Sequence, residues 1–202
     1  KATGSSAPLR LVLSQQHAEG GATKVLATLK AGRNEITVPQ LSSLDFEKGG
    51  QLYVEYTGAS DAEHWGVRVS GATAVPALDL YQVADPAERL ARTTAYLEKL
   101  EAHVGGLAQF HEEHHAKGGN ASVHYAYDEK NCIANATDIM LDQMMCSVPA
   151  QQILADAGGG STEARAERLL ASFDAMDQMM ELFYQHKGLT NSFEKNTPAA
   201  VV

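Results

Sequence analysis

The stretch Asp85-Pro86-Ala87-Glu88 divides the sequence into two parts of different character. Asp is a favoured N-cap residue, Pro is favoured at the first helical position, and an acidic side chain three residues after the cap can close a capping box. Apolar residues then recur at helical spacing among charged ones, at Leu90, Leu97, Leu100, Val104 and Leu107. The pattern predicts an amphipathic helix that begins here, is weakened at Gly105-Gly106 and is ended by Gly118-Gly119.

Upstream of this stretch the pattern is typical of β-structure. Short alternating or apolar runs lie between turn signals at Gly20-Gly21, residues 32–34 and Gly49-Gly50. The candidate strands are Leu9–Leu13, Lys24–Leu29, Glu35–Val38, Leu52–Tyr56 and Val67–Val69. Their spacing predicts a small antiparallel β sandwich-like subdomain over residues 1–84.

Downstream of it we expect helices only. A second helix is predicted from about Ile133 to Met145, and a third begins at Ser161 or Thr162 and ends at Gly188. The third carries apolar residues at steps of four and three, namely Leu169, Phe173, Met176, Met180 and Phe183. The expected fold is therefore α+β, with a helical subdomain over residues 85–202 and methionines that fill its core.

Composition excludes several classes of protein. Of the 202 residues 44% are hydrophobic, which is enough to form a core and excludes intrinsic disorder as the main description. The formal net charge is −9, so we expect no nucleic-acid partner. No apolar run approaches the roughly 20 residues that a membrane-spanning helix needs, so no membrane span is expected.

The two cysteines, Cys132 and Cys146, are too few for a disulfide-rich scaffold. If the segment between them were helical, 14 steps of about 1.5 Å would separate them by about 21 Å, which no disulfide spans. We expect two separate buried thiols, and a bond to a cysteine elsewhere stays open.

His111-Glu112-Glu113-His114-His115 matches the zinc motif H-E-x-x-H, in which two histidines one helical turn apart bind the metal and the Glu polarises bound water. Glu129 is a candidate third ligand. However, both x positions are polar, and the apolar stripe of the first helix continues onto His111 and His114. We favour histidines that cap a polar helix end or face solvent, with a small metalloenzyme using His111, Glu112 and His115 as the alternative.

A third hypothesis is a glycan-binding module without catalysis. Trp65, with Tyr53 and Tyr56 nearby in sequence, could stack on a sugar ring. Packing on a sheet face is the favoured interpretation of these three aromatic residues.

Several stretches resemble a known family. They are Lys1-Ala2-Thr3-Gly4, residues 29–39 (LKAGRNEITVP), residues 49–56 (GGQLYVEY), residues 131–139 (NCIANATDI) and Ser147-Val148-Pro149-Ala150. Together these stretches are similar to the enhancin-like, mucin-active zinc metallopeptidases, and most closely to the pseudomonad immunomodulating metalloproteases among them, which are O-glycopeptidases.

The resemblance implies a secreted, zinc-dependent endopeptidase that acts on O-glycosylated proteins. It also implies an order in which a β subdomain and helices precede the zinc helix, so that His111 and Glu112 lie too early to be the family's zinc ligand and catalytic base. No zinc ligand or catalytic residue is therefore assigned to this segment. Because the chain starts at Lys1 and ends in Ala200-Val201-Val202, we expect it to be part of a longer one, packed against the remainder of its catalytic domain.

Overall fold

A computed structural model describes residues 8–15, 22–39, 49–56, 66–114 and 132–187. The chain divides into two compact units. The first unit comprises Lys1–Ala74 and Ala108–Ala134, and the second comprises Val75–Leu107 and Asn135–Val202. The sequence predicted one boundary, after residue 84, between two continuous subdomains. Each unit of the structure instead combines two separate segments that are in contact. The boundary after residue 84 stays a prediction.

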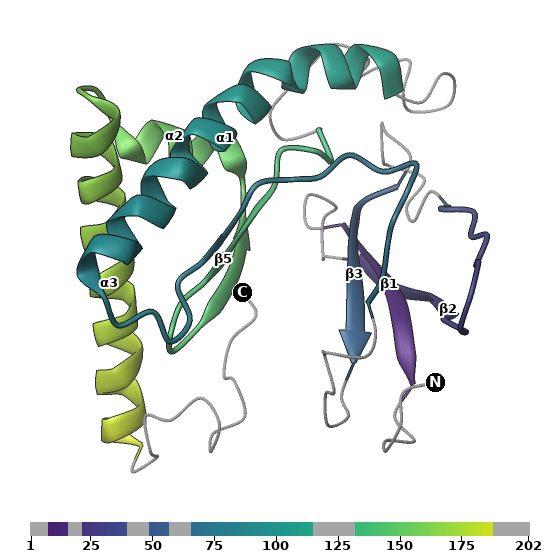
Figure 1. Ribbon diagram of the computed structural model, residues 1–202, viewed down its shortest axis with the longest axis horizontal. Coiled ribbons are helices and arrows are strands. Elements are labelled where there is room, and N and C mark those ends of the chain that lie inside the picture. The colour runs from purple at the N-terminus through teal and green to yellow at the C-terminus, as the bar shows by residue number, and fades with distance from the viewer. Residues whose placement is uncertain (1–7, 16–21, 40–48, 57–65, 115–131, 188–202) are drawn as a thin grey trace. The chain divides into compact units, whose positions relative to one another are not determined.

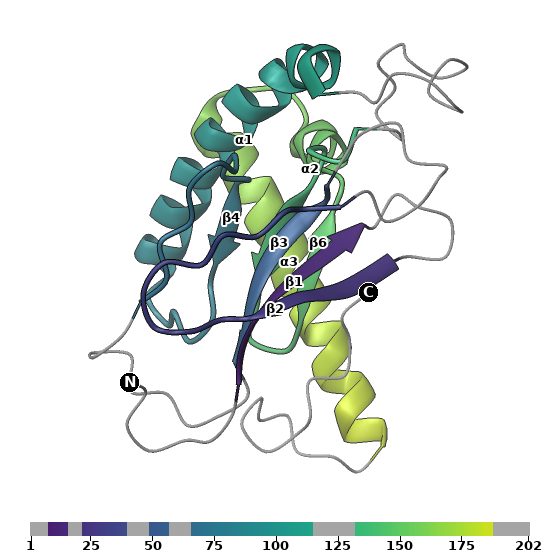
Figure 2. The ribbon, with the colours of Figure 1, turned by 90° about the vertical axis from the view of Figure 1, so that its right-hand side faces the viewer.

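The first unit contains a three-stranded antiparallel sheet in the order β2-β1-β3 (Figure 2). Its strands are β1 (Leu9–Gln15), β2 (Ala22–Thr28) and β3 (Gln51–Tyr56). The central strand β1 supplies the buried residues Leu11, Val12 and Leu13. Three of the predicted strands are thus confirmed, within two residues at each end.

Two other predicted strands are wrong. Residues 35–38 and 67–69 are described by the structure, and neither segment forms a strand. Residues 35–38 follow a turn that is closed by the side chain of Asn34. This side chain accepts from the Lys30 N–H and donates to the carbonyls of Lys30 and Gly32. Apolar alternation favours a strand only where a neighbouring strand is present to pair with it.

The second unit contains a small mixed sheet and most of the helical structure (Figure 1). β4 (Ala77–Asp79) pairs in parallel with β5 (Thr137–Met140), which pairs antiparallel with β6 (Met145–Val148). The helix predicted from Ile133 to Met145 is therefore wrong, because this segment forms β5, a tight turn and the start of β6. The predicted α+β class is confirmed, with a second sheet that the sequence analysis missed.

The helix α1 (Pro86–His114) begins as predicted. Asp85 caps it by accepting from the Ala87 N–H at 3.0 Å. The sequence predicts that Glu88 closes a capping box. In the structure its carboxylate accepts from both Nε and Nη2 of Arg92, one turn later. The predicted stop at Gly118-Gly119 lies outside the described residues.

Two further helices complete the second unit. α2 (Ala150–Ala157), which the sequence analysis did not predict, follows Pro149, and α3 (Thr162–His186) follows the cap residue Ser161. The Ser161 hydroxyl accepts from the Ala164 N–H, which confirms the predicted start of α3. The predicted end at Gly188 lies outside the described residues.

The core of the second unit draws on β4, α1, β5, β6, α2 and α3. It consists of Leu78, Leu80, Tyr96, Leu97, Leu100, Ile139, Leu141, Met144, Cys146, Ala150, Ala157, Leu169 and Phe173. Met176 and Met180 pack against this core, as predicted, whereas Met179 is 59% exposed. Among the described residues, no helix combines the length and apolarity that crossing a bilayer requires.

Candidate functional site

The first four residues of the motif His111-Glu112-Glu113-His114-His115 lie at the end of α1, and His115 lies outside the described residues. His111 is buried, with 1% of its surface exposed, while Glu112 and His114 are exposed. The apolar stripe of α1 therefore continues onto His111, as predicted, but not onto His114. The expectation that these histidines cap the helix or face solvent is wrong for His111.

His114 makes local contacts only. Its ring stacks on Phe110 with the centroids 4.2 Å apart, and its Nδ1 lies 2.8 Å from the Phe110 carbonyl oxygen. Because a carbonyl can only accept, Nδ1 carries the proton of this hydrogen bond. This side chain covers the end of the helix and is turned away from the buried face that holds His111.

His115 and Glu129, which would complete the zinc site of the alternative hypothesis, lie outside the described residues. Within the described ranges, no three His, Cys, Asp or Glu side chains gather closely enough to hold a metal ion. A zinc site built on His111 and His115 thus stays a prediction.

Two of the three proposed sugar-stacking aromatics, Tyr53 and Tyr56, lie on opposite faces of their sheet. Trp65 lies outside the described residues, and Tyr53 and Tyr56 are both half-buried on β3. Because successive side chains of a strand point to opposite faces, residues three apart lie on opposite faces of the sheet. Tyr53 and Tyr56 therefore cannot form a single platform with each other.

Three of the family-like stretches meet at Gly49 in the first unit. A Cβ placed on Gly49 would lie 3.6 Å from Val38 Cγ1 and 3.6 Å from Ile133 Cδ1. Val38 belongs to the stretch 29–39, Gly49 opens the stretch 49–56, and Ile133 belongs to the stretch 131–139. Side chains from segments that are far apart in the sequence thus lie next to one glycine, whose φ is +102°.

Gln51 connects two of the same stretches by a hydrogen bond. Its side-chain amide donates to the carbonyl of Ile133. The residue is 6% exposed, and its Oε1 is buried without a hydrogen-bond partner among the residues that the structure describes. A buried, unpaired amide oxygen is costly, so Gln51 marks a position where packing between the stretches outweighs full hydrogen bonding. A lone Gln at the start of a strand gave no signal of this role in the sequence.

The most buried polar contacts of the second unit surround β5. Thr137 Oγ1 donates to the Pro76 carbonyl at 2.8 Å, so the Tyr96 hydroxyl donates to Thr137 Oγ1 at 2.9 Å. Burial is the main reason that the pKa of Tyr96 is raised to about 12, and the hydrogen bond with Thr137 acts in the opposite direction. The phenol stays protonated at neutral pH and acts as a donor that holds α1 against the sheet.

Cys and Ser side chains can act as nucleophiles, but the surroundings of Cys146 and Ser147 on β6 do not activate them. Burial, and then the charges of Asp138 and Asp177, raise the pKa of the Cys146 thiol, which disfavours the reactive thiolate. The Ser147 hydroxyl donates to the Asp138 carboxylate and is buried. The prediction of two separate buried thiols is confirmed, since Cys132 and Cys146 are both buried and no disulfide joins them.

Asp177 of α3 fixes the turn between β5 and β6. Its two carboxylate oxygens accept from the backbone N–H groups of Asp142 at 3.1 Å and Gln143 at 3.0 Å. Burial raises the pKa of Asp177 above 3.8 although both hydrogen bonds lower it. This contact is structural, because both carboxylate oxygens are already used by the turn.

Comparison with protein-family models, with curated proteins and with solved structures returns no match. The candidate functional residues of this chain are therefore those that its own sequence and contacts indicate. Val38, Gly49 and Ile133 bring three of the stretches that resemble the family together, and Thr137 and Asp138 of residues 131–139 also pair with Val148 and Ser147.

Proposed function

We propose that this chain is the front, non-catalytic part of the catalytic region of a secreted zinc metallopeptidase that cleaves O-glycosylated, mucin-type proteins. In this proposal the first unit flanks the substrate cleft and the helices provide a scaffold. The zinc helix belongs to another part of the same polypeptide. The partners of the segment are then the O-glycosylated substrate and the remainder of its own catalytic domain.

The contact of the three family-like stretches at Gly49 is the observation that supports the proposal. Short similarities scattered along a chain arise easily by chance, and chance places them without regard to one another in space. Here Val38 of residues 29–39 and Ile133 of residues 131–139 both lie next to Gly49, each 3.6 Å from the position that a Cβ would take there, and Gln51 of residues 49–56 donates a hydrogen bond to Ile133. This grouping in space supports the interpretation of the three stretches as one substructure.

The donor sets of the described residues do not fit a catalytic zinc. Such a site needs three protein ligands around an open position, and the described residues bring no such set together. His111 is buried, whereas Glu112 beside it is exposed. For this reason the proposal assigns neither a zinc ligand nor a catalytic base to the segment.

The proposal is tested by comparing the 202-residue chain with the longer polypeptide expressed from its natural gene. Both are incubated with a mucin-type O-glycosylated peptide and with the same peptide lacking glycans. We expect the longer polypeptide to cleave only the glycosylated peptide, to lose activity with a zinc chelator, and the 202-residue chain to cleave neither. Cleavage by the 202-residue chain alone, or failure of the longer polypeptide to cleave the glycopeptide, would overturn the proposal.

A further inference from the structure

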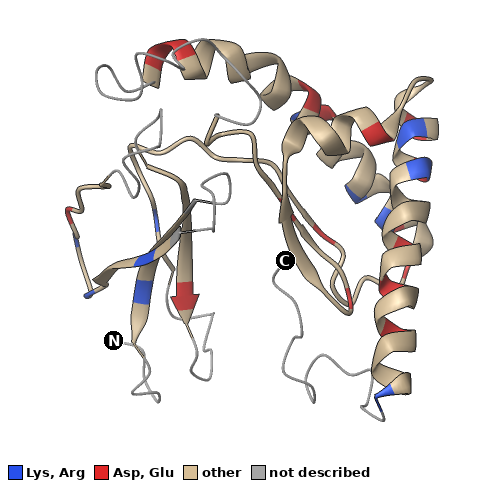
Figure 3. Cartoon of the chain, turned by 180° about the vertical axis from the view of Figure 1, so that it is seen from behind, with Lys and Arg blue, Asp and Glu red and all other residues tan. Residues whose placement is uncertain are grey.

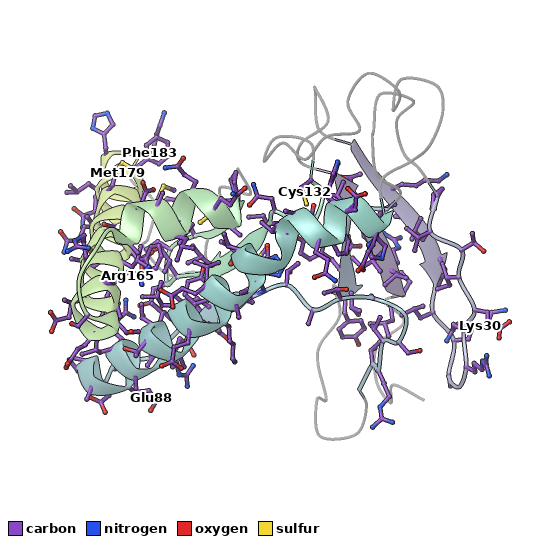
Figure 4. The ribbon with its side chains drawn as sticks, turned by 90° about the horizontal axis from the view of Figure 1, so that it is seen from above. Lys30, Glu88, Cys132, Arg165, Met179 and Phe183 are labelled. Atoms are coloured by element: carbon purple, nitrogen blue, oxygen red, sulfur yellow. The ribbon has the colours of Figure 1, made fainter. Side chains whose placement is uncertain are left out.

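Two consecutive glycines lie in the interior of α1. Gly105 and Gly106 are followed by eight further residues of the helix, to His114, and Figure 4 shows α1 as one unbroken helix from the labelled Glu88 onward. Apart from Pro, Gly is the least favourable residue inside a helix, because its backbone is the most free in the unfolded chain. The pair is therefore a weak point in a long, continuous helix.

Packing does not explain the two glycines. Both are exposed, and a Cβ placed on either of them would meet no atom of the described residues within 4 Å. Neither glycine lies at the end of α1, where Gly is favoured as a cap. Alanine would fit at both positions and would favour the helix. The effect of glycine here is therefore on the backbone and not on the space around it.

The glycines lie where α1 passes from one unit to the other. The second unit includes α1 up to Leu107, and the first unit resumes at Ala108. Before the glycines, Val104 packs against the core of the second unit. After them, Leu107 and His111 are each 1% exposed, but neither belongs to that core. The surroundings of the buried side of α1 thus change at the glycines.

The chain passes between the two units at three places, after Ala74, Leu107 and Ala134. Residues 73–76 and 133–136 form neither helix nor strand, whereas the passage after Leu107 lies inside α1. Among the described elements, α1 is therefore the regular one that joins the units. The stiffness of its backbone limits how far the two units can turn relative to each other.

Ion pairs do not strengthen α1 at this point. Residues 102–111 contain no Lys, Arg, Asp or Glu, and Figure 3 shows this part of the helix in tan. Opposite charges one turn apart stabilise a helix, as Arg92 and Glu88 do near the start of α1. No pair of these residue types at such spacing can span Gly105 and Gly106.

We propose that Gly105-Gly106 is a hinge at which α1 bends, so that the two units change their orientation relative to each other in solution. A bend is cheap at such a pair, because the glycine backbone absorbs the change in φ and ψ while the helix on either side keeps its own hydrogen bonds. The inference goes beyond the proposed function and does not depend on it. In the proposed peptidase, the hinge would move the unit that flanks the substrate cleft.

Distances between two spin labels test the hinge. Lys24→Cys on β2 provides an exposed thiol in the first unit, and Glu167→Cys on α3 provides one in the second, while the natural cysteines are buried. Pulsed electron paramagnetic resonance measures the distance distribution in the labelled 202-residue chain. The same labels are placed in the double variant Gly105→Ala with Gly106→Ala, and in the control Ala91→Gly, an exposed position of α1 within the second unit.

The double alanine variant should give a narrower distance distribution than wild type, since each exchange favours the helical backbone about fivefold. Ala91→Gly weakens α1 within one unit and should leave the distribution as in wild type. Equal widths for wild type and the double alanine variant would overturn the inference. A broadening by Ala91→Gly as large as the narrowing by the two alanines would also overturn it, because general helix stability would then set the spread. Peptidase activity does not enter the measurement, so its result is separate from that of the proposed function.

Discussion

Tyr96 and Thr137 form the most buried side-chain hydrogen bond of the second unit. Thr137 is completely buried and Tyr96 is 2% exposed, and the two side chains join α1 to β5. The hydroxyl of Thr137 also bonds to Pro76, which precedes β4. Two side chains thus hold a helix and two strands together, and removal of either hydroxyl leaves a buried partner atom without its bond.

Tyr96→Phe should therefore destabilise the chain by about 1 kcal/mol, the usual contribution of a buried neutral hydrogen bond. Urea denaturation at neutral pH measures the free energy of unfolding. Tyr81→Phe is the matched control, because the Tyr81 hydroxyl accepts from Gln82 in an exposed setting, and it should change the free energy by less than about 0.5 kcal/mol. Equal effects of the two substitutions would contradict the assignment.

Asp177 predicts a pH dependence. Burial raises its pKa in the folded state above 3.8, so the folded state binds a proton more readily than the unfolded state does. The ionised carboxylate therefore weakens the fold above the folded-state pKa, and stability is recovered as the pH falls through that pKa toward 3.8. On acidification, wild type should gain stability relative to Asp177→Asn, whose side chain does not titrate.

Urea denaturation at about pH 7 and about pH 4 measures this difference. Asp156→Asn removes a carboxylate from an exposed position on α2 and controls for the change in net charge. If wild type instead lost stability relative to Asp177→Asn on acidification, the raised pKa would be wrong.

Among the elements, the starts of α1 and α3 were predictable because their capping signals are local. The Asp85 and Ser161 caps each act on an N–H within three residues, so the residue type and position alone identify them. The segment 133–145 was not predictable in this way. Ile133, Thr137 and Leu141 follow one another at helical spacing, yet the turn after β5 is fixed by Asp177, a residue 34 positions beyond Gln143. A distant partner of this kind leaves no trace in the local pattern.

Ser161→Ala should lower the free energy of unfolding by about 1 kcal/mol, since it removes the side-chain cap of α3. Ser172→Ala in the same helix is the control. The Ser172 hydroxyl bonds to the Arg168 carbonyl from an exposed position, and Ala is the better helix former, so this change should be neutral or slightly stabilising. A destabilisation by Ser172→Ala as large as that by Ser161→Ala would argue against the cap.

The position of Gly49 next to Val38 and Ile133 supports the proposed function, and substitution of Gly49 tests it. Gly49→Ala should destabilise by about 1–2 kcal/mol, because a φ of +102° is unfavourable for any residue with a Cβ, although the space next to Val38 and Ile133 permits ordinary contact. Gly105→Ala in α1, where a Cβ meets nothing within 4 Å, should be stabilising by up to about 1 kcal/mol. Chemical denaturation of both variants decides this, and an unchanged stability of Gly49→Ala would show that the contact is not constrained.

At the scale of the whole molecule, the sequence predicted the α+β class but not how segments combine. The last residues of α1, 108–114, belong to the first unit although the rest of the helix belongs to the second. β5 and β6 belong to the second unit, in a segment for which only helices were expected. The candidate site shows the same limit. The H-E-x-x-H motif was visible as a pattern, whereas the burial of His111 and the contact of three stretches at Gly49 depend on long-range packing.

We propose that the segment belongs to a zinc peptidase but does not itself hold the zinc. Elemental mass spectrometry of the purified 202-residue chain tests it most directly, together with His111→Asn at the buried position and His114→Asn at the exposed one. Circular dichroism confirms that each variant is folded. If residues 1–202 do not hold the zinc, we expect well below one zinc per chain in wild type and in both variants. About one zinc per chain in wild type and in His114→Asn, lost in His111→Asn, would contradict it and make the motif on α1 the metal site.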